Sequence, residues 1–341
     1  MFVVRRRRRL VASVLVTGGA GFIGSHVADA LIARGHQVTV LDDLSGGYRD
    51  NVPASATFVE GSVTDPGSVD NLFSTNSFDY VFHLAAYAAE GLSHFIKRFN
   101  YTNNVIGSVN LINASVNTGV KGFVFTSSIA VYGASAELPM SETTPRRPED
   151  SYGIAKLAVE QELAASRAMF GLDYIVFRPH NVYGTRQNIA DRYRNVVGIF
   201  MNQVLQGRPM TIFGDGTQTR AFSYIDDVAP IIADSITEPR AWNEVFNVGA
   251  DQPLSLNDLA REVARAMDVD PVVEHLPPRS EVAHAHSSHE KSRNVFGARP
   301  QTPLQDGLRR MAVWVRRHGA RETPGFAAIE ISKNLPEIWK L

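Results

Sequence analysis

Thr17-Gly-Gly-Ala-Gly-Phe-Ile-Gly24 is the stretch of sequence that decides the fold. It follows the apolar run Ser13–Thr17, which is typical of a buried strand, and it opens the run Phe22–Arg34, which is typical of a helix. Its glycines have the spacing G-x-x-G-x-x-G, at Gly18, Gly21 and Gly24. Glycine is needed where a backbone turns with positive φ or approaches a pyrophosphate closely, and a helix N-terminus adds amide donors. The stretch therefore predicts a phosphate-binding turn between a strand and a helix.

An acidic residue follows at the distance that a dinucleotide requires. Asp42 comes directly after a second apolar run, Gln37–Leu41, and stands 18 residues after the last of the three glycines. A carboxylate in this place suits the ribose diol of NAD and repels the 2′-phosphate of NADP. Asp43 is a second candidate for contact with the adenosine. We therefore expect NAD as the cofactor.

Short apolar runs alternate with helical segments through the first half of the chain. Strands that are apolar on both faces and are separated by helices predict a parallel sheet covered on both sides, in a doubly wound α/β fold. The further expected strands are Thr57–Glu60, Tyr80–Leu84, Gly122–Ser127 and Tyr174–Arg178, and the expected helices are Ser68–Phe73, Ser93–Thr118 and Ser151–Phe170.

Loops lengthen after about residue 182, which indicates a second, smaller, mixed α/β region. We expect an NAD-binding domain of residues 13–182 plus 221–249, a substrate domain of residues 183–220 plus 250–330, and a basic extension of residues 1–12. The expected elements here are helices at Val196–Leu205, Asp226–Ile236, Ser255–Met267 and Leu304–Arg317, and a strand at Val245–Val248. Ser255 is a good N-cap residue.

The composition supports a large core and excludes several classes of protein. The chain has 341 residues, 44% of them hydrophobic and 20% charged, which suits a folded protein of about two domains. Its 34 basic and 35 acidic side chains nearly balance, which argues against a nucleic-acid partner. It has no cysteine, so disulfides, thiolate metal sites and cysteine nucleophiles are excluded. No apolar run approaches the roughly 18 residues of a membrane span, and we expect a cytoplasmic protein without a membrane partner.

Charge is unevenly distributed along the chain, because five consecutive arginines stand at Arg5–Arg9. The segment 1–12 has the basic character of the start of a signal peptide, but the apolar stretch after it continues into the glycine motif. We interpret the segment as a solvated extension, with binding to an anionic surface as the alternative.

A candidate proton-transfer site lies at Tyr152 and Lys156, which stand one helical turn apart on one face of the helix expected over 151–170. Tyrosine titrates near pH ~10 and is a poor base at neutral pH. A nearby ammonium, together with a nicotinium charge, stabilises the phenolate and lowers that pKa. Ser127 and Ser128 end the preceding strand, where a hydroxyl can orient the substrate hydroxyl that loses its proton.

Together these motifs resemble the extended short-chain dehydrogenase/reductase superfamily, which contains the nucleotide-sugar epimerases and dehydratases. The resemblance covers the chain from about Val14 to about Arg317 and implies a Rossmann fold. The matching segments are TGGAGFIGSH at the glycine motif, HLAA (His83–Ala86), TSSIAVYG (Thr126–Gly133), YGIAK (Tyr152–Lys156), RPHNVYG (Arg178–Gly184) and TRAFSYIDDV (Thr219–Val228).

The resemblance implies roles for individual positions. Ser128 matches the catalytic Ser/Thr of the family, Tyr152 its base, and Lys156 the lysine that holds the nicotinamide ribose. The candidate cofactor residues are Gly18, Gly21, Phe22, Ile23, Gly24, Asp42, Asp43, Ser62, Val63, Leu84, Ala85, Ala86, Asn103 and Lys156. The candidate substrate residues are Ser127, Ser128, Tyr152, Asn181, Arg192, Asn195, Arg220 and Arg279, of which the last two match arginines that grip the diphosphate. In one departure, Ser62 stands where the family usually has the aspartate that bonds the adenine amine.

The residues just before Tyr132 discriminate among the reactions of the superfamily. Dehydratases carry an acidic pair there and decarboxylases a glutamate, whereas this chain has Ile129 and Ala130, which cannot move a proton. Branches whose acid–base group is a cysteine are excluded by its absence. We therefore expect epimerisation at carbon 4, in which Tyr152 takes the 4-hydroxyl proton, directly or through Ser128, and carbon 4 passes hydride to NAD. A decarboxylase or dehydratase is the alternative if an acid from elsewhere reaches the pocket, and a non-enzymatic regulator is a third.

The sugar stays open at this point. The resemblance implies UDP as the nucleotide, and UDP-glucose/UDP-galactose is the common pair. Loop 184–194 carries Arg186, Arg192 and Arg194, which suit a carboxylate at carbon 6 and so favour UDP-glucuronate/UDP-galacturonate. Solvated or phosphate-binding arginines are the plainer interpretation.

Two further expectations concern metal and assembly. Four of the ten histidines lie within His275–His289, which we interpret as a polar loop rather than a metal site, because the spacings match none that we know. The resemblance implies a homodimer in which the helices near 93–118 and 151–170 pair with their mates as a four-helix bundle. Leu157, Leu163 and Phe170 on the second helix are compatible with this pairing.

Overall fold

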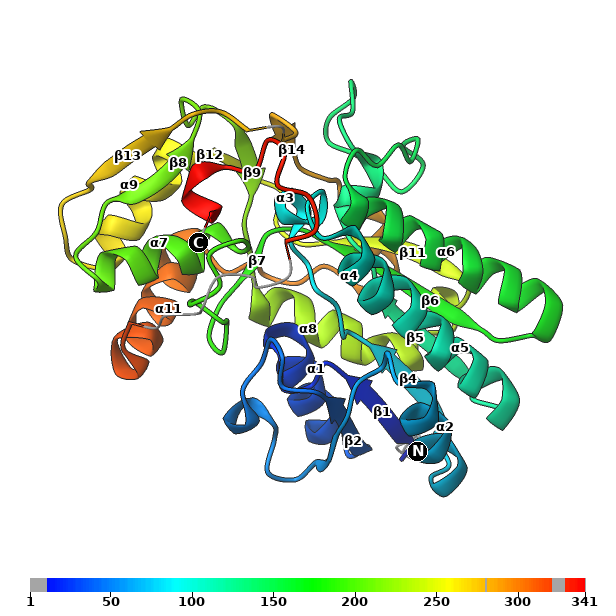
Figure 1. Ribbon diagram of the computed structural model, residues 1–341. Coiled ribbons are helices and arrows are strands. Elements are labelled where there is room, and N and C mark those ends of the chain that lie inside the picture. Colours follow the sequence, from blue (N-terminus) through cyan, green and yellow to red (C-terminus); the bar gives the residue numbers. More distant parts are fainter. Residues whose placement is uncertain (1–10, 280, 321–328, 341) are drawn as a thin grey trace.

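The computed structural model describes residues 11–279, 281–320 and 329–340, so the run Arg5–Arg9 lies outside the described residues (Figure 1). Within the described residues, seven parallel strands form the main sheet, in the spatial order β3-β2-β1-β4-β5-β6-β11. In chain order the strands are β1 (Ser13–Thr17), β2 (Gln37–Asp42), β3 (Thr57–Glu60), β4 (Tyr80–His83), β5 (Gly122–Thr126), β6 (Tyr174–Pro179) and β11 (Glu244–Val248). The predicted doubly wound Rossmann fold is confirmed.

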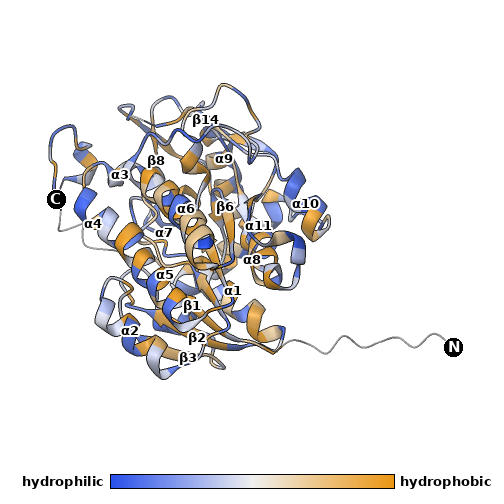
Figure 2. Ribbon diagram, turned by 90° about the vertical axis from the view of Figure 1, so that its right-hand side faces the viewer, coloured by the Kyte–Doolittle hydropathy of each residue, from blue (hydrophilic) through white to orange (hydrophobic). Residues whose placement is uncertain are grey.

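Helices cover both faces of this sheet because its strands are apolar on both faces. In β1, Val14 and Val16 pack with helices α1 and α8, whereas Leu15 packs on the opposite face with α2, α5 and α6. Figure 2 shows apolar strands between helices that carry both apolar and hydrophilic residues. The bounds of these helices are α1 (Phe22–Ala33), α2 (Pro66–Thr75), α5 (Gly107–Thr118), α6 (Ser151–Phe170) and α8 (Ile225–Asp234).

Local caps set the ends of the helices that the sequence predicts best. The Asp150 side chain accepts a hydrogen bond from the Gly153 amide at 2.8 Å at the start of α6, and Gly171, with a φ of 80°, ends that helix. Ser255 accepts a bond from the Asp258 amide at 3.0 Å and caps α9 (Leu256–Ala266), as expected. The predicted bounds of α6 and of α7 (Val196–Leu205) are confirmed.

The continuous helix predicted over Ser93–Thr118 is wrong. The structure has α3 (Glu90–Ser93), α4 (Lys97–Tyr101), a π-helical turn (Thr102–Ile106) and then α5. Buried Ile96 interrupts the first part, with a φ of −135° and a ψ of 47°. Two asparagine side chains then bond to backbone outside the helix: Asn100 donates to the Ser151 carbonyl at 2.8 Å and Asn104 to the Tyr87 carbonyl at 3.1 Å. These tertiary bonds accompany the wider π turn, which is frequent at functional sites.

A smaller region of short sheets lies beside the carboxyl ends of the main strands (Figure 1). Its strands are β7 (Val182–Tyr183), β8 (Met210–Phe213), β9 (Thr219–Ala221), β10 (Ser223–Tyr224), β12 (Pro253–Ser255), β13 (Val273–Leu276) and β14 (His284–Ala285). Its helices, besides α7 and α9, are α10 (Glu290–Phe296) and α11 (Leu304–His318). The residue limits that we predict for the two domains stay an interpretation. Among the described residues, no helix combines the length and apolar character needed to cross a membrane.

Candidate active site

A cleft of about 690 Å³ gathers the residues that the sequence singled out. It runs along the carboxyl ends of the main strands, where the order of the sheet reverses between β1 and β4, which is where ligands bind in doubly wound folds. The candidate cofactor and substrate residues all line this cleft except Ser62, and of the three loop arginines Arg192 and Arg194 line it whereas Arg186 does not. Ser62 is not among the lining residues, although its neighbours Gly61 and Val63 are, and its hydroxyl lies 3.0 Å from the hydroxyl of Thr64.

The glycine turn has space for a ligand and none for side chains. Gly18 has a φ of 72°, and a Cβ placed on it would lie 2.7 Å from the Ala85 nitrogen. A Cβ on Gly24 would lie 2.1 Å from the Gly18 oxygen. Gly21 caps α1 without any side-chain bond, so the first amides of the helix are left for another acceptor. This cradle fits a dinucleotide pyrophosphate.

The carboxylate of Asp42 closes the cradle. It accepts hydrogen bonds from the Ala20 amide at 3.0 Å and the Leu44 amide at 2.8 Å, and burial raises the pKa of Asp42. Asp43 is exposed and accepts a bond from the Ser45 amide at 3.0 Å. The buried, fixed carboxylate is therefore Asp42, at the end of β2, as a ribose contact requires.

Ser128, Tyr152 and Lys156 meet where β5 ends against α6. The Ser128 hydroxyl bonds to the Tyr152 phenol, and burial, together with the Glu90 carboxylate, raises the pKa of Tyr152. The Lys156 ammonium donates to the Thr126 carbonyl at 2.8 Å and lies 5.7 Å from the centre of the Tyr152 ring. Burial lowers the pKa of Lys156 to about 7. The three side chains can hold and pass a proton between Tyr152 and Ser128.

A buried ionic network lies beneath these residues, and no local pattern in the sequence predicts it. The guanidinium of Arg178, on β6, donates from Nε to Glu160 of α6 at 2.9 Å. It also donates from Nη1 to the Tyr132 hydroxyl at 2.7 Å. Tyr132 donates in turn to Asn247 at 2.8 Å. The Ser127 hydroxyl donates to Glu160 at 2.6 Å, so this predicted substrate contact is occupied within the protein.

The comparisons decide the family. The sequence model of the NAD dependent epimerase/dehydratase family matches residues 14–249. The chain belongs to this family. The predicted superfamily and the predicted cofactor, NAD, are thereby confirmed.

Relatives of this epimerase/dehydratase family resemble the chain over most of its length. A UDP-glucose 4-epimerase from Mycolicibacterium smegmatis is 35% identical over 309 residues, which are 89% of this chain and 98% of that protein. A crystal structure of a UDP-glucose 4-epimerase with UDP-glucose from Thermotoga maritima has a TM-score of 0.85 at 36% identity, over 90% of this chain and 99% of that one. A UDP-N-acetyl-alpha-D-glucosaminuronate decarboxylase from Bacillus cytotoxicus is 29% identical over 320 residues, which are 89% of this chain and 97% of that protein.

In this epimerase/dehydratase family member, the arginines of the cleft differ in how freely they point to a ligand. Arg194 is paired with Asp191 at 2.7 Å, and Arg279 with Glu281 at 2.9 Å. Arg220 donates to the carbonyl of Ala283 at 3.0 Å. Arg186 is paired with Asp29 of α1 and is not among the lining residues, whereas exposed Arg192 is.

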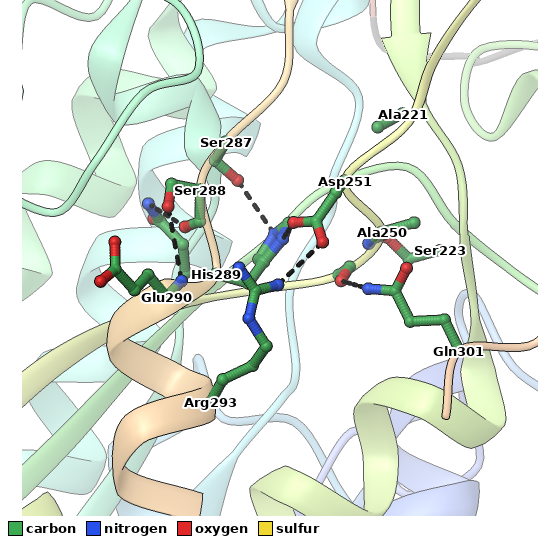
Figure 3. Close-up of polar contacts among 12 residues, drawn as sticks. Ala221, Ser223, Ala250, Asp251, Ser287, Ser288, His289, Glu290, Arg293 and Gln301 are labelled. Atoms are coloured by element: carbon green, nitrogen blue, oxygen red, sulfur yellow. Dashed lines mark hydrogen bonds and ion pairs between the residues drawn. The ribbon is translucent and has the colours of Figure 1, made fainter. Parts of the chain in front are cut away.

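The histidine-rich segment is fastened by one buried side chain. His289 lies 2.7 Å from Asp251 through Nδ1 and 3.0 Å from His180 through Nε2, and burial lowers the pKa of His289. Figure 3 shows His289 and Arg293 both turned toward Asp251, with Ser287 next to the imidazole. No group of three or more metal-ligating side chains gathers anywhere in the described part of the chain. The cluster holds the segment that carries the cleft residues Glu281 and Ala285.

Proposed function

We propose that this protein is an NAD-dependent 4-epimerase of a UDP-hexose. The observation that carries the proposal is the meeting of Ser128, Tyr152 and Lys156 in the cleft that begins at the glycine cradle. Ile129 and Ala130 also line the cleft, so the places where the family's dehydratases and decarboxylases carry acids hold side chains that transfer no proton.

The chain's own residues have four tasks in this reaction. The glycine cradle and Asp42 bind and orient the cofactor, and Tyr152 takes the proton of the 4-hydroxyl, with Ser128 as its hydrogen-bond partner. NAD held there would supply the acceptor and donor of the carbon-4 hydride. Lys156 stabilises the phenolate, since a cation near a phenol favours its ionised form. Arg220, Arg279 and Asn195 keep the diphosphate in place while the sugar turns its other face.

Two observations support the neutral pair UDP-glucose/UDP-galactose over the uronates. Arg186 and Arg194, which a carbon-6 carboxylate would need, are paired with Asp29 and Asp191. The relatives from Mycolicibacterium smegmatis and Thermotoga maritima are named UDP-glucose 4-epimerases. Arg192 alone of the three lines the cleft with an exposed side chain.

The assembly that we propose is a homodimer formed through α6 and its neighbours. Ile106, on the π-helical turn, is 50% exposed, and Ile154, on α6, is 44% exposed, although both are large apolar side chains. Phe170 is also exposed. Leu163 is fully buried within the chain, so it is a core residue rather than an interface residue. The cytoplasmic location stays a prediction.

Incubation with UDP-glucose followed by nuclear magnetic resonance of the products tests the activity. We expect UDP-galactose, with no net change in NAD. Tyr152→Phe is expected to abolish turnover while NAD still binds, because the phenol is the base. Tyr174→Phe is the matched control, since Tyr174 lies on β6 outside the cleft lining. Full activity of Tyr152→Phe would refute the assignment.

A dehydratase is the second candidate, because one acid does reach the cleft from elsewhere. Glu90, the first residue of α3, is among the lining residues. Elimination of water needs both a base and an acid for the leaving hydroxyl. A 4-keto-6-deoxy sugar among the products would favour this candidate, whereas UDP-galactose alone would exclude it.

A further inference from the structure

The short helix α3 connects two parts of the cleft that bind different parts of a nucleotide sugar. At its end, the Ser93 hydroxyl accepts a hydrogen bond from the Tyr152 amide at 3.1 Å. Near its start, a Cβ on Gly91 would lie 3.5 Å from Nη1 of Arg279. Glu90 therefore lies between the residue that we place at carbon 4 and an arginine that we place at the diphosphate.

A hexose occupies the same interval, because carbon 1 bears the diphosphate and carbon 4 lies across the ring. The Glu90 carboxylate interacts electrostatically with Tyr152 and with both Arg220 and Arg279. Its side chain lines the interior of the cleft, where protein surrounds it while the open space of the cleft keeps its surface accessible. Glu90 is therefore placed to face the sugar ring.

Glu90 differs from the other carboxylates of this region in having no partner. Asp150 accepts a bond from the Gly153 amide at 2.8 Å, and Glu281 is paired with Arg279. Among the residues that the structure describes, none forms a hydrogen bond or an ion pair with the Glu90 carboxylate. One free carboxylate is a ready acceptor for a donor on a ligand, but it is not the acid–base pair that elimination requires.

We propose that Glu90 is a specificity-determining residue that accepts a hydrogen bond from a sugar hydroxyl and excludes sugars that carry a carboxylate. A second carboxylate beside Glu90 would be repelled in a cleft where water screens charge poorly. A neutral hexose offers hydroxyl donors and no such repulsion. The inference rests on the proposed function, because it takes carbon 4 to lie at Tyr152.

The ionisation of Glu90 supports a pH-dependent form of this selectivity. Burial, with the Asp150 carboxylate next, raises the pKa of Glu90 to about 7. The charged and titratable groups that act on it are Asp150, Arg220, Arg279, Glu281 and Tyr152. The ionisation of Glu90 is thereby moved toward neutral pH, so discrimination against a uronate should grow as the pH rises from 6 to 8.

The test compares binding of UDP-glucose and UDP-glucuronate to the NAD-loaded protein by calorimetry, separately from turnover. For Glu90→Gln we expect the ratio of the two dissociation constants to shift by about tenfold or more in favour of UDP-glucuronate. Glu90→Asp keeps the charge and should keep the ratio. Glu149→Gln removes an exposed carboxylate outside the cleft lining and is the control for net charge.

The outcomes separate this inference from the proposed function. A ratio that rises from pH 6 to pH 8 in the wild type and is flat in Glu90→Gln supports the role of Glu90. An unchanged ratio in Glu90→Gln, or the absence of binding by both nucleotide sugars, overturns it. Wild-type protein that discriminates through Glu90 but makes no UDP-galactose would refute the 4-epimerase alone.

Discussion

Gly24 shows how little room the cofactor cradle leaves at the scale of a single residue. A methyl group there would meet the Gly18 carbonyl at 2.1 Å, and backbone cannot move aside as the end of a flexible side chain can. The third glycine of the motif is therefore required by the contact between helix α1 and the turn before it.

Gly24→Ala is expected to weaken NAD binding roughly tenfold or more, because overpacking by one carbon typically costs about 1–3 kcal/mol. Titration of NAD by calorimetry measures this. Gly67→Ala, in the first turn of α2, is the control, since a Cβ there meets only Asp65 Oδ1 at 3.5 Å. It should leave NAD binding unchanged, and equal losses in both variants would contradict the explanation.

Single residues also show which parts of the candidate site can be predicted from the sequence. The sequence was sufficient to select Gly18, Asp42, Tyr152 and Lys156 as candidate site residues, because each belongs to a short motif with a characteristic spacing. Glu90 was not, because its meaning depends on α3 lying between two distant parts of the chain. Arg186 was interpreted as a candidate sugar contact, but the fold brings it to Asp29 instead.

At the scale of elements, α6 is held to β6 by a charge pair that lies beneath the residues that we propose as catalytic. The side chains of Arg178 and Glu160 are 1% and 3% exposed. A buried pair adds little stability over an apolar one, but the loss of one partner leaves an uncompensated buried charge. Glu160 also favours the charged form of Lys156, one turn earlier on the helix.

Glu160→Gln should therefore lower the free energy of unfolding by about 3 kcal/mol, because the Arg178 guanidinium stays buried without its carboxylate. Urea unfolding followed by circular dichroism measures the change. Glu162→Gln removes an exposed carboxylate from the same helix and should change stability little. Equal changes in the free energy of unfolding for the two substitutions would contradict a special contribution of the buried pair.

Helices also differ in whether the residues that set their bounds are close in sequence or distant. The bounds of α6 and α7 were predictable to the residue, and for α6 a carboxylate cap and a glycine at the two ends explain this. The break between α3 and α5 was not predictable. It lies at buried Ile96, and the π-helical turn after it accompanies bonds from Asn100 and Asn104 to the carbonyls of Ser151 and Tyr87, which lie outside that helix.

At the scale of the whole molecule, α5 and α6 lie on the outside of the fold (Figures 1 and 2). Large apolar side chains are exposed on α6 and on the π-helical turn that packs beside it. Such a surface favours pairing with a second copy, because association removes apolar area from water. The dimer would leave the cleft open, since the cleft lies at the carboxyl ends of the strands.

Sedimentation velocity is expected to give the mass of two chains. The double substitution Ile106→Asp with Ile154→Asp should give the mass of one, because it places charges in the apolar contact. Val313→Asp, at an equally exposed site on α11, should leave the dimer intact. A single-chain mass for the wild-type protein would refute the pairing.

The cleft has a consequence for how the protein comes into being during synthesis. Its walls are drawn from Gly18 near one end of the chain and from Trp339 near the other, where the Trp339 ring lies 5.5 Å from the Arg279 guanidinium. A nascent chain can complete its glycine cradle early, but it cannot finish the opposite wall until residue 339 has left the ribosome. A chain that ends before residue 339 therefore lacks part of the wall that surrounds the cleft.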